Sequence, residues 1–235
     1  MTSLLIRYEQ GDCQNVWHDI HGIEDVTQLA KSDYCDVVDV IDVTTDRIRL
    51  NVITLYTWLL EAGYQFELPE FAYVPAHSES RNVADLLVDS VGAVPLLFRA
   101  WLTEVGLVCF RGKPRLESAH APWREAMLDP LEILYSLDGT MEMLEDRSTS
   151  DLDFEFAADT YTKNGFGGGM PTHLTLPSAT PDAWIREAPE QATRDGVWFV
   201  DYLREYFSSF GFRSTALSTA RIDAFPQRPP SLLLI

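Results

Sequence analysis

Residues 94–108 read VPLLFRAWLTEVGLV, and they predict a helix that leads directly into a strand. Pro95 is tolerated in the first turn of a helix, and the following LLFRAWLTEV is expected to stay helical until Gly106 ends it. The next run, LVCF at 107–110, is short and apolar, as is typical of a buried strand. A helix and a strand in direct succession indicate helices packed on a sheet.

The second half of the chain continues this pattern with further strands and a closing helix. Strands are expected at 131–135, 153–157 and 172–176, where short aliphatic or aromatic runs are bounded by turn residues. A final helix is expected to start near Thr193 or Asp195 and to end at Gly211. Its apolar side chains at helical spacing are Phe199, Tyr202, Leu203, Tyr206 and Phe210. The fold class predicted is therefore α+β, with a mainly antiparallel sheet flanked by helices.

The first third of the chain is predicted to be helical. The apolar stripe of its main helix consists of Val37, Ile41, Ile48, Val52 and Leu55. The β-branched residues around 43–45 allow a break, after which the helix resumes and stops at Gly63. A shorter helix is expected at 15–20 and another at 82–92.

Two prolines, Pro69 and Pro75, interrupt the periodicity after the main helix and predict a connection between domains. The expected division is a helical region at 1–66, a linker at 67–80, an α+β domain at 81–222 and a tail at 223–235. The tail contains three prolines followed by SLLLI, and it either docks on the body or stays disordered.

The charge of the chain narrows the choice of partner. The sequence has 36 acidic and 18 basic side chains, which give a formal net charge of -18. A field of this sign repels nucleic acid and anionic lipid and attracts cationic surfaces, although acidity also serves solubility alone. We therefore expect neither nucleic acid nor membrane as a direct partner.

The cysteines and the N-terminal residues predict a cytoplasmic location. Cys13, Cys35 and Cys109 are widely spaced and form no C-x-x-C pair, so they suggest neither a disulfide framework nor a zinc site. The segment before Arg7 has only three consecutive apolar residues, too few for a signal peptide, and no apolar run approaches the roughly 20 residues of a membrane span.

Several segments, taken in order, resemble the SMI1/KNR4 or SUKH superfamily. The run 94–108 with Arg111 and Gly112 looks like the superfamily's "LP-x-x-L-R-x-F/W-x-x-x-V-G-x-V" helix-to-strand core. Similar to later family elements are Asp129, Pro130 and Leu131, then Ala157, Ala158, Asp159, Tyr161, Lys163, Asn164, Gly167 and Gly168, and the closing Phe199, Val200, Tyr202, Leu203, Arg204 and Phe207. The N-terminal part resembles the helical extension of uncharacterised bacterial proteins with this core.

This resemblance implies binding rather than catalysis. Many SUKH members are immunity proteins that neutralise a toxin by direct binding, and others act in regulatory interactions. No catalytic residue comes with the family, so the resemblance implies no active site and no cofactor.

Among the residues themselves, the clearest candidate surface is acidic. Asp151, Asp153 and Glu155 alternate with apolar residues, so on a strand their carboxylates share one face, about 6–7 Å apart along the chain. Such a row is either a solvated edge strand protected from aggregation or a face that meets a basic partner. We take these three residues as the predicted partner-binding site.

Two other features are weaker candidates. His18 and His21 have a spacing at which two imidazoles on a helix could share a metal, but no third ligand follows at a fixed offset, and we predict no metal site. The glycine-rich run at 165–169 fits neither the Walker nor the dinucleotide pattern, which favours a hairpin connection.

The sequence therefore predicts a non-catalytic protein that binds another protein, such as a cationic toxin domain. No G-x-S-x-G motif is present, and no motif ties a histidine to a serine or cysteine nucleophile. Two alternatives stay open: a small-molecule-binding protein or hydrolase with a site between the two regions near Gly165–Gly169, and a regulatory scaffold that self-associates through its apolar tail.

Overall fold

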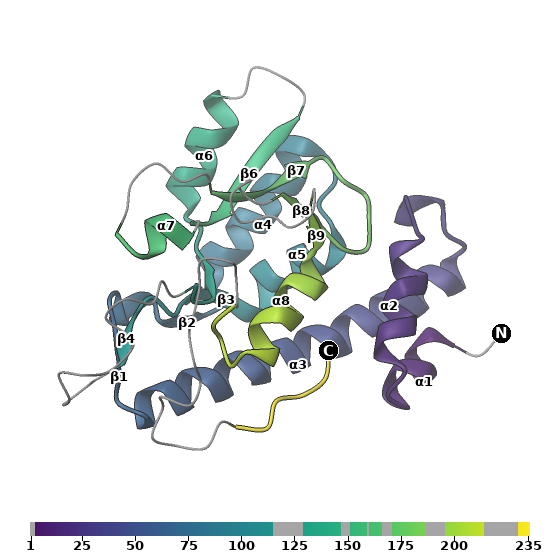
Figure 1. The fold of residues 1–235 in the computed structure, drawn as a ribbon. Helices are drawn as coiled ribbons and strands as arrows, with labels where there is room; N and C mark the ends of the chain where they lie inside the picture. The colour runs from purple at the N-terminus through teal and green to yellow at the C-terminus, as the bar shows by residue number, and fades with distance from the viewer. Residues whose placement is uncertain are drawn as a thin grey trace.

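The computed structural model of this chain describes residues 3–114, 129–146, 151–158, 160–165, 171–186, 196–213 and 230–235. Helices at the N-terminus precede the strands, and further helices flank the sheets, which confirms the α+β fold class (Figure 1). All strand pairs in the described residues are antiparallel.

Three α-helices and one 3₁₀ turn open the chain. They are α1 (Leu4–Glu9), α2 (Cys13–His21), η1 (Val26–Gln28) and α3 (Lys31–Glu61). The 31 residues of α3 are continuous, so the possible break near Val43–Thr45 does not occur. Thr44 and Thr45 are buried, and the Thr45 hydroxyl donates a hydrogen bond to the Ile41 carbonyl at 2.8 Å. Packing therefore overrides the low helix propensity of these β-branched residues.

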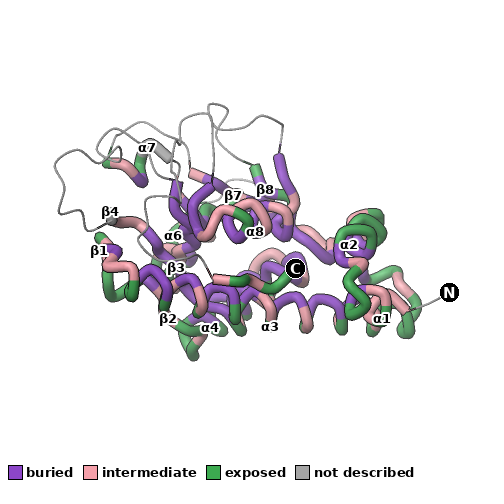
Figure 2. Tube along the Cα trace, turned by 60° about the horizontal axis from the view of Figure 1, so that its bottom comes forward, coloured by how far each residue is buried: buried purple, intermediate pink, exposed green. Residues whose placement is uncertain are grey.

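Helix α3 runs along the molecule, and it contacts the N-terminal helix α1 as well as elements that follow it in the chain (Figure 1). The predicted stripe of five apolar residues between Val37 and Leu55 is buried, and the helix ends just before Gly63, whose φ is +76°. In Figure 2 the buried side of α3 faces the later helices and strands. The helical period in the sequence thus correctly predicted which side of α3 joins the core.

The segment after α3 is part of the folded body. It contains β1 (Tyr64–Phe66), the 3₁₀ turn η2 (Pro69–Phe71) and β2 (Tyr73–Pro75). Strand β2 lies inside the stretch 67–80 that was expected to link two domains, and it pairs antiparallel with β3 (Gly106–Cys109). The sequence division into domains stays a prediction, since it concerns which parts fold independently.

The helix-to-strand unit has the predicted order. It consists of α4 (Ser78–Val91), α5 (Leu96–Ala100), a π-helical turn, η3 (Trp101–Val105), and β3. Gly106 has φ +102°, and a Cβ atom there would lie 2.2 Å from the Val74 carbonyl oxygen in β2. Only glycine allows the helix to end at this point while the two strands approach so closely.

The described strands form three sheets, with orders β1–β4, β2–β3–β5 and β6–β7–β8–β9. The strands not yet introduced are β4 (Gly112–Pro114), β5 (Glu132–Ile133), β6 (Leu152–Ala157), β7 (Thr172–Leu176), β8 (Trp184–Arg186) and β9 (Val197–Trp198). The predicted strand at 172–176 matches β7, whereas β5 covers only two of the residues at 131–135. The short helices α6 (Leu137–Asp146) and α7 (Thr160–Lys163) flank β6 in sequence.

The closing helix, α8 (Phe199–Ser208), begins later than predicted. Residues 197–198 form β9, which pairs with β8, so the helix cannot start near Thr193 or Asp195. Of its predicted apolar residues, Phe199, Tyr202, Leu203 and Tyr206 are buried. Phe210 lies beyond the helix, which ends at Ser208 and not at Gly211.

One hydrophobic core joins the N-terminal helices to the later elements. Its buried side chains extend from Tyr8 to Ile235, so the last residues of the chain dock on the body (Figure 2). In the parts of the chain that the structure describes, no helix combines the length and the hydropathy required to cross a bilayer.

Candidate functional site

The predicted partner-binding residues lie in a row on one exposed face. Asp151 directly precedes β6, and Asp153 and Glu155 lie within it; all three are exposed. Leu152, Phe154 and Phe156, which alternate with these acidic residues, are buried in the core. We call Asp151, Asp153 and Glu155 the acidic strand face. The strict alternation in the sequence was sufficient to place it.

Two residues of β7, Thr175 and His173, lie close to the carboxylates of this face. Thr175 lies opposite Asp153 and donates a hydrogen bond to its carboxylate at 2.8 Å. His173 lies opposite Glu155, and its Nε2 is 4.0 Å from Asp153 Oδ1. Strand β6 is the first in its sheet order, and on its other side Leu134 donates a backbone hydrogen bond to Phe156. The carboxylates thus project from a supported edge strand.

Of the glycine-rich run at 165–169, the structure describes Gly165. Gly165 is exposed with φ +79°, and residues 166–170 lie outside the described residues. The site expected beneath the loop Gly165–Gly169 therefore falls outside the described residues as well.

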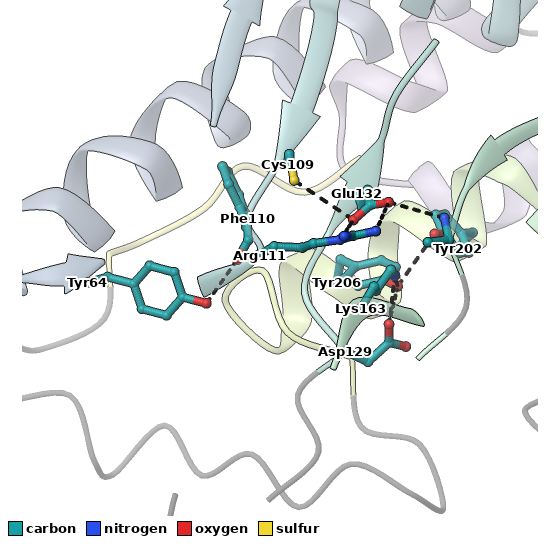
Figure 3. Close-up of polar contacts among 10 residues, drawn as sticks. Tyr64, Cys109, Phe110, Arg111, Asp129, Glu132, Lys163, Tyr202 and Tyr206 are labelled. Atoms are coloured by element: carbon teal, nitrogen blue, oxygen red, sulfur yellow. Dashed lines mark hydrogen bonds and ion pairs between the residues drawn. The ribbon is translucent and has the colours of Figure 1, made fainter. Parts of the chain in front are cut away.

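Charged side chains from distant segments of the chain meet around strand β5 (Figure 3). Lys163 at the end of α7 places its Nζ 2.7 Å from Asp129 Oδ1 and 3.2 Å from the Tyr206 hydroxyl, which itself donates to Asp129. Asp129 is 1% exposed and Lys163 is 7% exposed. Burial favours the neutral amine, but the Asp129 carboxylate, together with Tyr202 and Glu132, outweighs this effect and raises the pKa of Lys163.

A second ion pair adjoins the first. Glu132 of β5 is buried and accepts hydrogen bonds from the Arg111 guanidinium and from the backbone N–H of Ala158. The Cys109 thiol is 3.8 Å from the same carboxylate, and burial raises its pKa to about 11. We call Arg111, Asp129, Glu132, Lys163 and Tyr206 the buried ionic cluster.

The chemistry of this cluster is that of a structural element. A lysine that is enclosed and held protonated cannot act as a nucleophile or a general base, and each carboxylate already has a cationic partner. Asp129 and Lys163 belong to two of the segments that resemble SUKH proteins, yet sequence reasoning did not predict that they meet. No local spacing indicates a pair 34 residues apart.

A shallow pocket opens elsewhere, between α2 and α8. Its volume is about 260 Å³, and it is lined by Gln14, Trp17, His18, His21, Asp201 and Arg204. His21 Nε2 lies 3.0 Å from Asp182 Oδ2, and its ring stacks on Trp198 with centroids 4.4 Å apart. Burial raises the pKa of Asp182, opposed by the hydrogen bonds from His21 and from two backbone N–H groups.

The structure shows where the two histidines His18 and His21 lie. His18 and His21 line the same pocket, but the partner of His21 is the Asp182 carboxylate. Among the described residues, no group of three or more potential metal ligands comes together. A histidine oriented by a carboxylate is half of a nucleophile-activating system. The described residues that line this pocket include no serine, threonine or cysteine for it to activate.

Comparison with known proteins finds no relative. No family model, no curated protein and no solved structure matches the chain. Its likeness to SUKH proteins therefore rests on the residues quoted above.

Proposed function

We propose that this protein binds another protein without catalysis, as an immunity or antitoxin protein with a SUKH-like α+β domain. The proposed partner is a cationic toxin domain, and the acidic strand face forms part of the contact. The toxin would be neutralised by occlusion of its working surface, in a reducing cytoplasm where all three thiols stay free.

The observation that carries this proposal is the exposure of three carboxylates in one row at the edge of a sheet. Asp153 keeps 60% of its side chain exposed although it accepts a hydrogen bond from Thr175. The net charge of -18 adds a long-range field of the same sign. A cationic partner would be steered toward such a surface, which raises the association rate more than the final affinity.

Two features of the described residues favour binding over catalysis. The buried lysine that would be the most reactive amine is protonated and paired with Asp129. The histidine with an orienting carboxylate, His21, lies in a pocket whose lining residues offer it no nucleophile.

A small-molecule site is the second candidate, and the pocket between α2 and α8 is the observation that favours it. Trp17 and Gln14 provide an apolar and a polar wall, and Arg204 and Asp201 provide charges. The described residues that line this pocket belong to the N-terminal helix α2 and the later helix α8, and residues 166–169 of the glycine-rich run lie outside the described residues.

The test is the association rate with the toxin domain encoded in the neighbouring reading frame, measured by stopped flow at rising salt. The triple variant Asp151→Asn, Asp153→Asn, Glu155→Gln should associate roughly tenfold more slowly at low salt, and the difference should vanish near 1 M salt, where charges are screened within about 3 Å.

A matched control removes the same charges elsewhere. Glu9, Asp33 and Asp39 are exposed on α1 and near the start of α3, at the end of the molecule away from β6 (Figure 1). The variant Glu9→Gln, Asp33→Asn, Asp39→Asn has the same net charge as the first variant and should associate nearly as fast as the natural protein. Equal rates for both variants, at every salt concentration, would rule out the acidic strand face as the contact.

A further inference from the structure

The last described segment, PSLLLI at 230–235, lies across α3 and α8 as an extended chain (Figure 1). It belongs to no helix or strand, yet its final residue, Ile235, is only 2% exposed. The body therefore holds this segment through contacts other than a sheet or a helix interface.

Asn51, in the middle of α3, contacts the segment through both ends of its side-chain amide. Its Nδ2 donates to the Leu233 carbonyl at 2.8 Å, and its Oδ1 accepts from the Leu233 N–H at 2.7 Å. The amide thus pairs with one residue of an extended backbone as a neighbouring β-strand would. Asn51 is 1% exposed while the segment is in place, so these two hydrogen bonds are shielded from water.

Two arginines bind the next two carbonyl groups. Arg47 Nη1 donates to the Leu234 carbonyl at 2.9 Å, and Arg204 Nε donates to the Ile235 carbonyl at 2.8 Å. Each arginine is also held by the body itself, since Arg47 lies 4.6 Å from the centre of the Tyr8 ring and Arg204 pairs with Asp201 at 2.8 Å. The donors are therefore oriented by contacts that do not involve the segment.

The side chains of the segment divide sharply in their exposure. Ile235 is buried and Leu232 packs partly against the core, whereas Leu233 is 46% exposed and Leu234 is 60% exposed. The body thus binds the segment through the backbone of three consecutive residues and through one buried aliphatic side chain, that of Ile235. This combination is typical of sites that bind extended peptides.

We propose that the groove formed by Arg47, Asn51 and Arg204 is a peptide-binding site, and that residues 230–235 of the same chain are its exchangeable occupant. The ligand class is an extended peptide with an aliphatic residue at the position of Ile235. The hydrogen bonds that hold the segment go to its backbone, and it pairs with no strand and forms no helix, so we expect it to open without unfolding of the body. This inference is independent of the acidic strand face.

Release of the segment would also affect the pocket between α2 and α8. Arg204 lines that pocket and binds the Ile235 carbonyl, so occupancy of the groove fixes the position of one pocket wall. The side chain of Arg204 thus connects the groove to the pocket.

The test uses the full chain with Ile235→Asp, because a charge at the buried position expels the resident segment. A labelled, C-terminally amidated peptide PSLLLI is titrated against this protein by fluorescence anisotropy, after circular dichroism has established that it is folded. We expect saturable binding, and at least about tenfold weaker binding to the natural chain, whose own segment competes. The lack of binding to the folded Ile235→Asp protein would overturn the proposal.

Neighbouring positions in the peptide provide a matched control. A peptide with Leu234→Asp should bind like the parent because that side chain faces the solvent, whereas a peptide with Ile235→Asp should not bind. Adding Asn51→Leu to the receptor should weaken binding about 30-fold, as expected for two lost hydrogen bonds. Equal binding of the two aspartate peptides, or to the Asn51→Leu receptor, would contradict the assigned site.

Hydrogen exchange in the natural chain tests the proposal even if Ile235→Asp does not fold. The Leu233 amide should be protected, lose its protection in Asn51→Leu, and exchange faster than the amides of α3. Exchange at the rate of the α3 core would show that the segment opens only on global unfolding. A dimer of the natural chain that Asn51→Leu abolishes would assign the segment to a second copy and overturn its place in the same chain.

Discussion

Asp129 and Asp153 are both aspartates in the α+β part of the chain, but their surroundings are opposite. Asp129 is 1% exposed with the Lys163 ammonium 2.7 Å away, whereas the side chain of Asp153 is 60% exposed and the Nε2 atom of His173 lies 4.0 Å from it. A charge in the interior must be paired because desolvation costs several kcal/mol, and a charge on the surface is screened by water. The buried ionic cluster therefore serves the fold, and the acidic strand face is available to a partner.

The largest expected effect comes from removing the buried cation. Lys163→Met leaves the Asp129 carboxylate buried without its partner and should reduce the free energy of unfolding by about 3–5 kcal/mol. Urea denaturation followed by circular dichroism measures this loss. The double variant Lys163→Met, Asp129→Asn also removes the unpaired carboxylate charge, so it should regain part of the lost free energy of unfolding. A loss below 1 kcal/mol for the single variant would show that the interior charge does not need its partner.

A second difference should appear in thiol reactivity. Cys35 is exposed, whereas burial raises the pKa of Cys109, beside the buried ionic cluster, from 9.0 to about 11. At pH 8 this shift alone lowers the thiolate fraction of Cys109 about 100-fold, so iodoacetamide should modify Cys35 first. Peptide mass spectrometry measures both rates, and the unfolded chain in guanidinium should show similar rates. Comparable rates in the folded protein would contradict the enclosure of Cys109.

The same pKa shift gives a direction for stability. The unfolded chain releases the Cys109 proton near pH 9.0 and the folded chain only near pH 11. The folded state therefore binds more protons in this window, and stability should fall as the pH rises through it. Cys109→Ala should remove this part of the pH dependence.

The smallest effect is expected on the surface. Asp153→Asn keeps an acceptor for Thr175 and removes only a screened charge, so the free energy of unfolding should change by no more than about 0.5 kcal/mol. Thermal unfolding at matched pH measures it, with Lys163→Met as the contrasting variant. A reduction of the free energy of unfolding by more than 1 kcal/mol would mean that Asp153 stabilises the sheet, which would contradict a role in partner binding alone.

Local periodicity predicted much of the fold. The buried stripe of α3, the helix that ends before Gly106 and the alternation along β6 all follow from which residues recur at a spacing of 3.6 or 2. Periodicity failed where the elements are short. Strands β8 and β9 have three and two residues, and β9 displaced the expected start of α8 because its pairing with β8 lies outside any local pattern.

The candidate sites also differ in whether local spacing in the sequence could predict them. The acidic strand face follows from alternation within five residues, and the sequence alone located it. His21 and Asp182 are 161 positions apart, and Asn51 and Leu233 are 182 positions apart. No spacing rule connects such residues, so both the pocket and the groove became visible only in three dimensions.

The sequence by itself determined which faces of the helices and strands are apolar, because that depends only on the order of residues along a regular backbone. The tertiary structure decided which charges lose water and which partners they gain. The same carboxylate type accordingly became a buried ion pair at Asp129 and an exposed charge at Asp153, because desolvation and Coulomb attraction depend on distances through space.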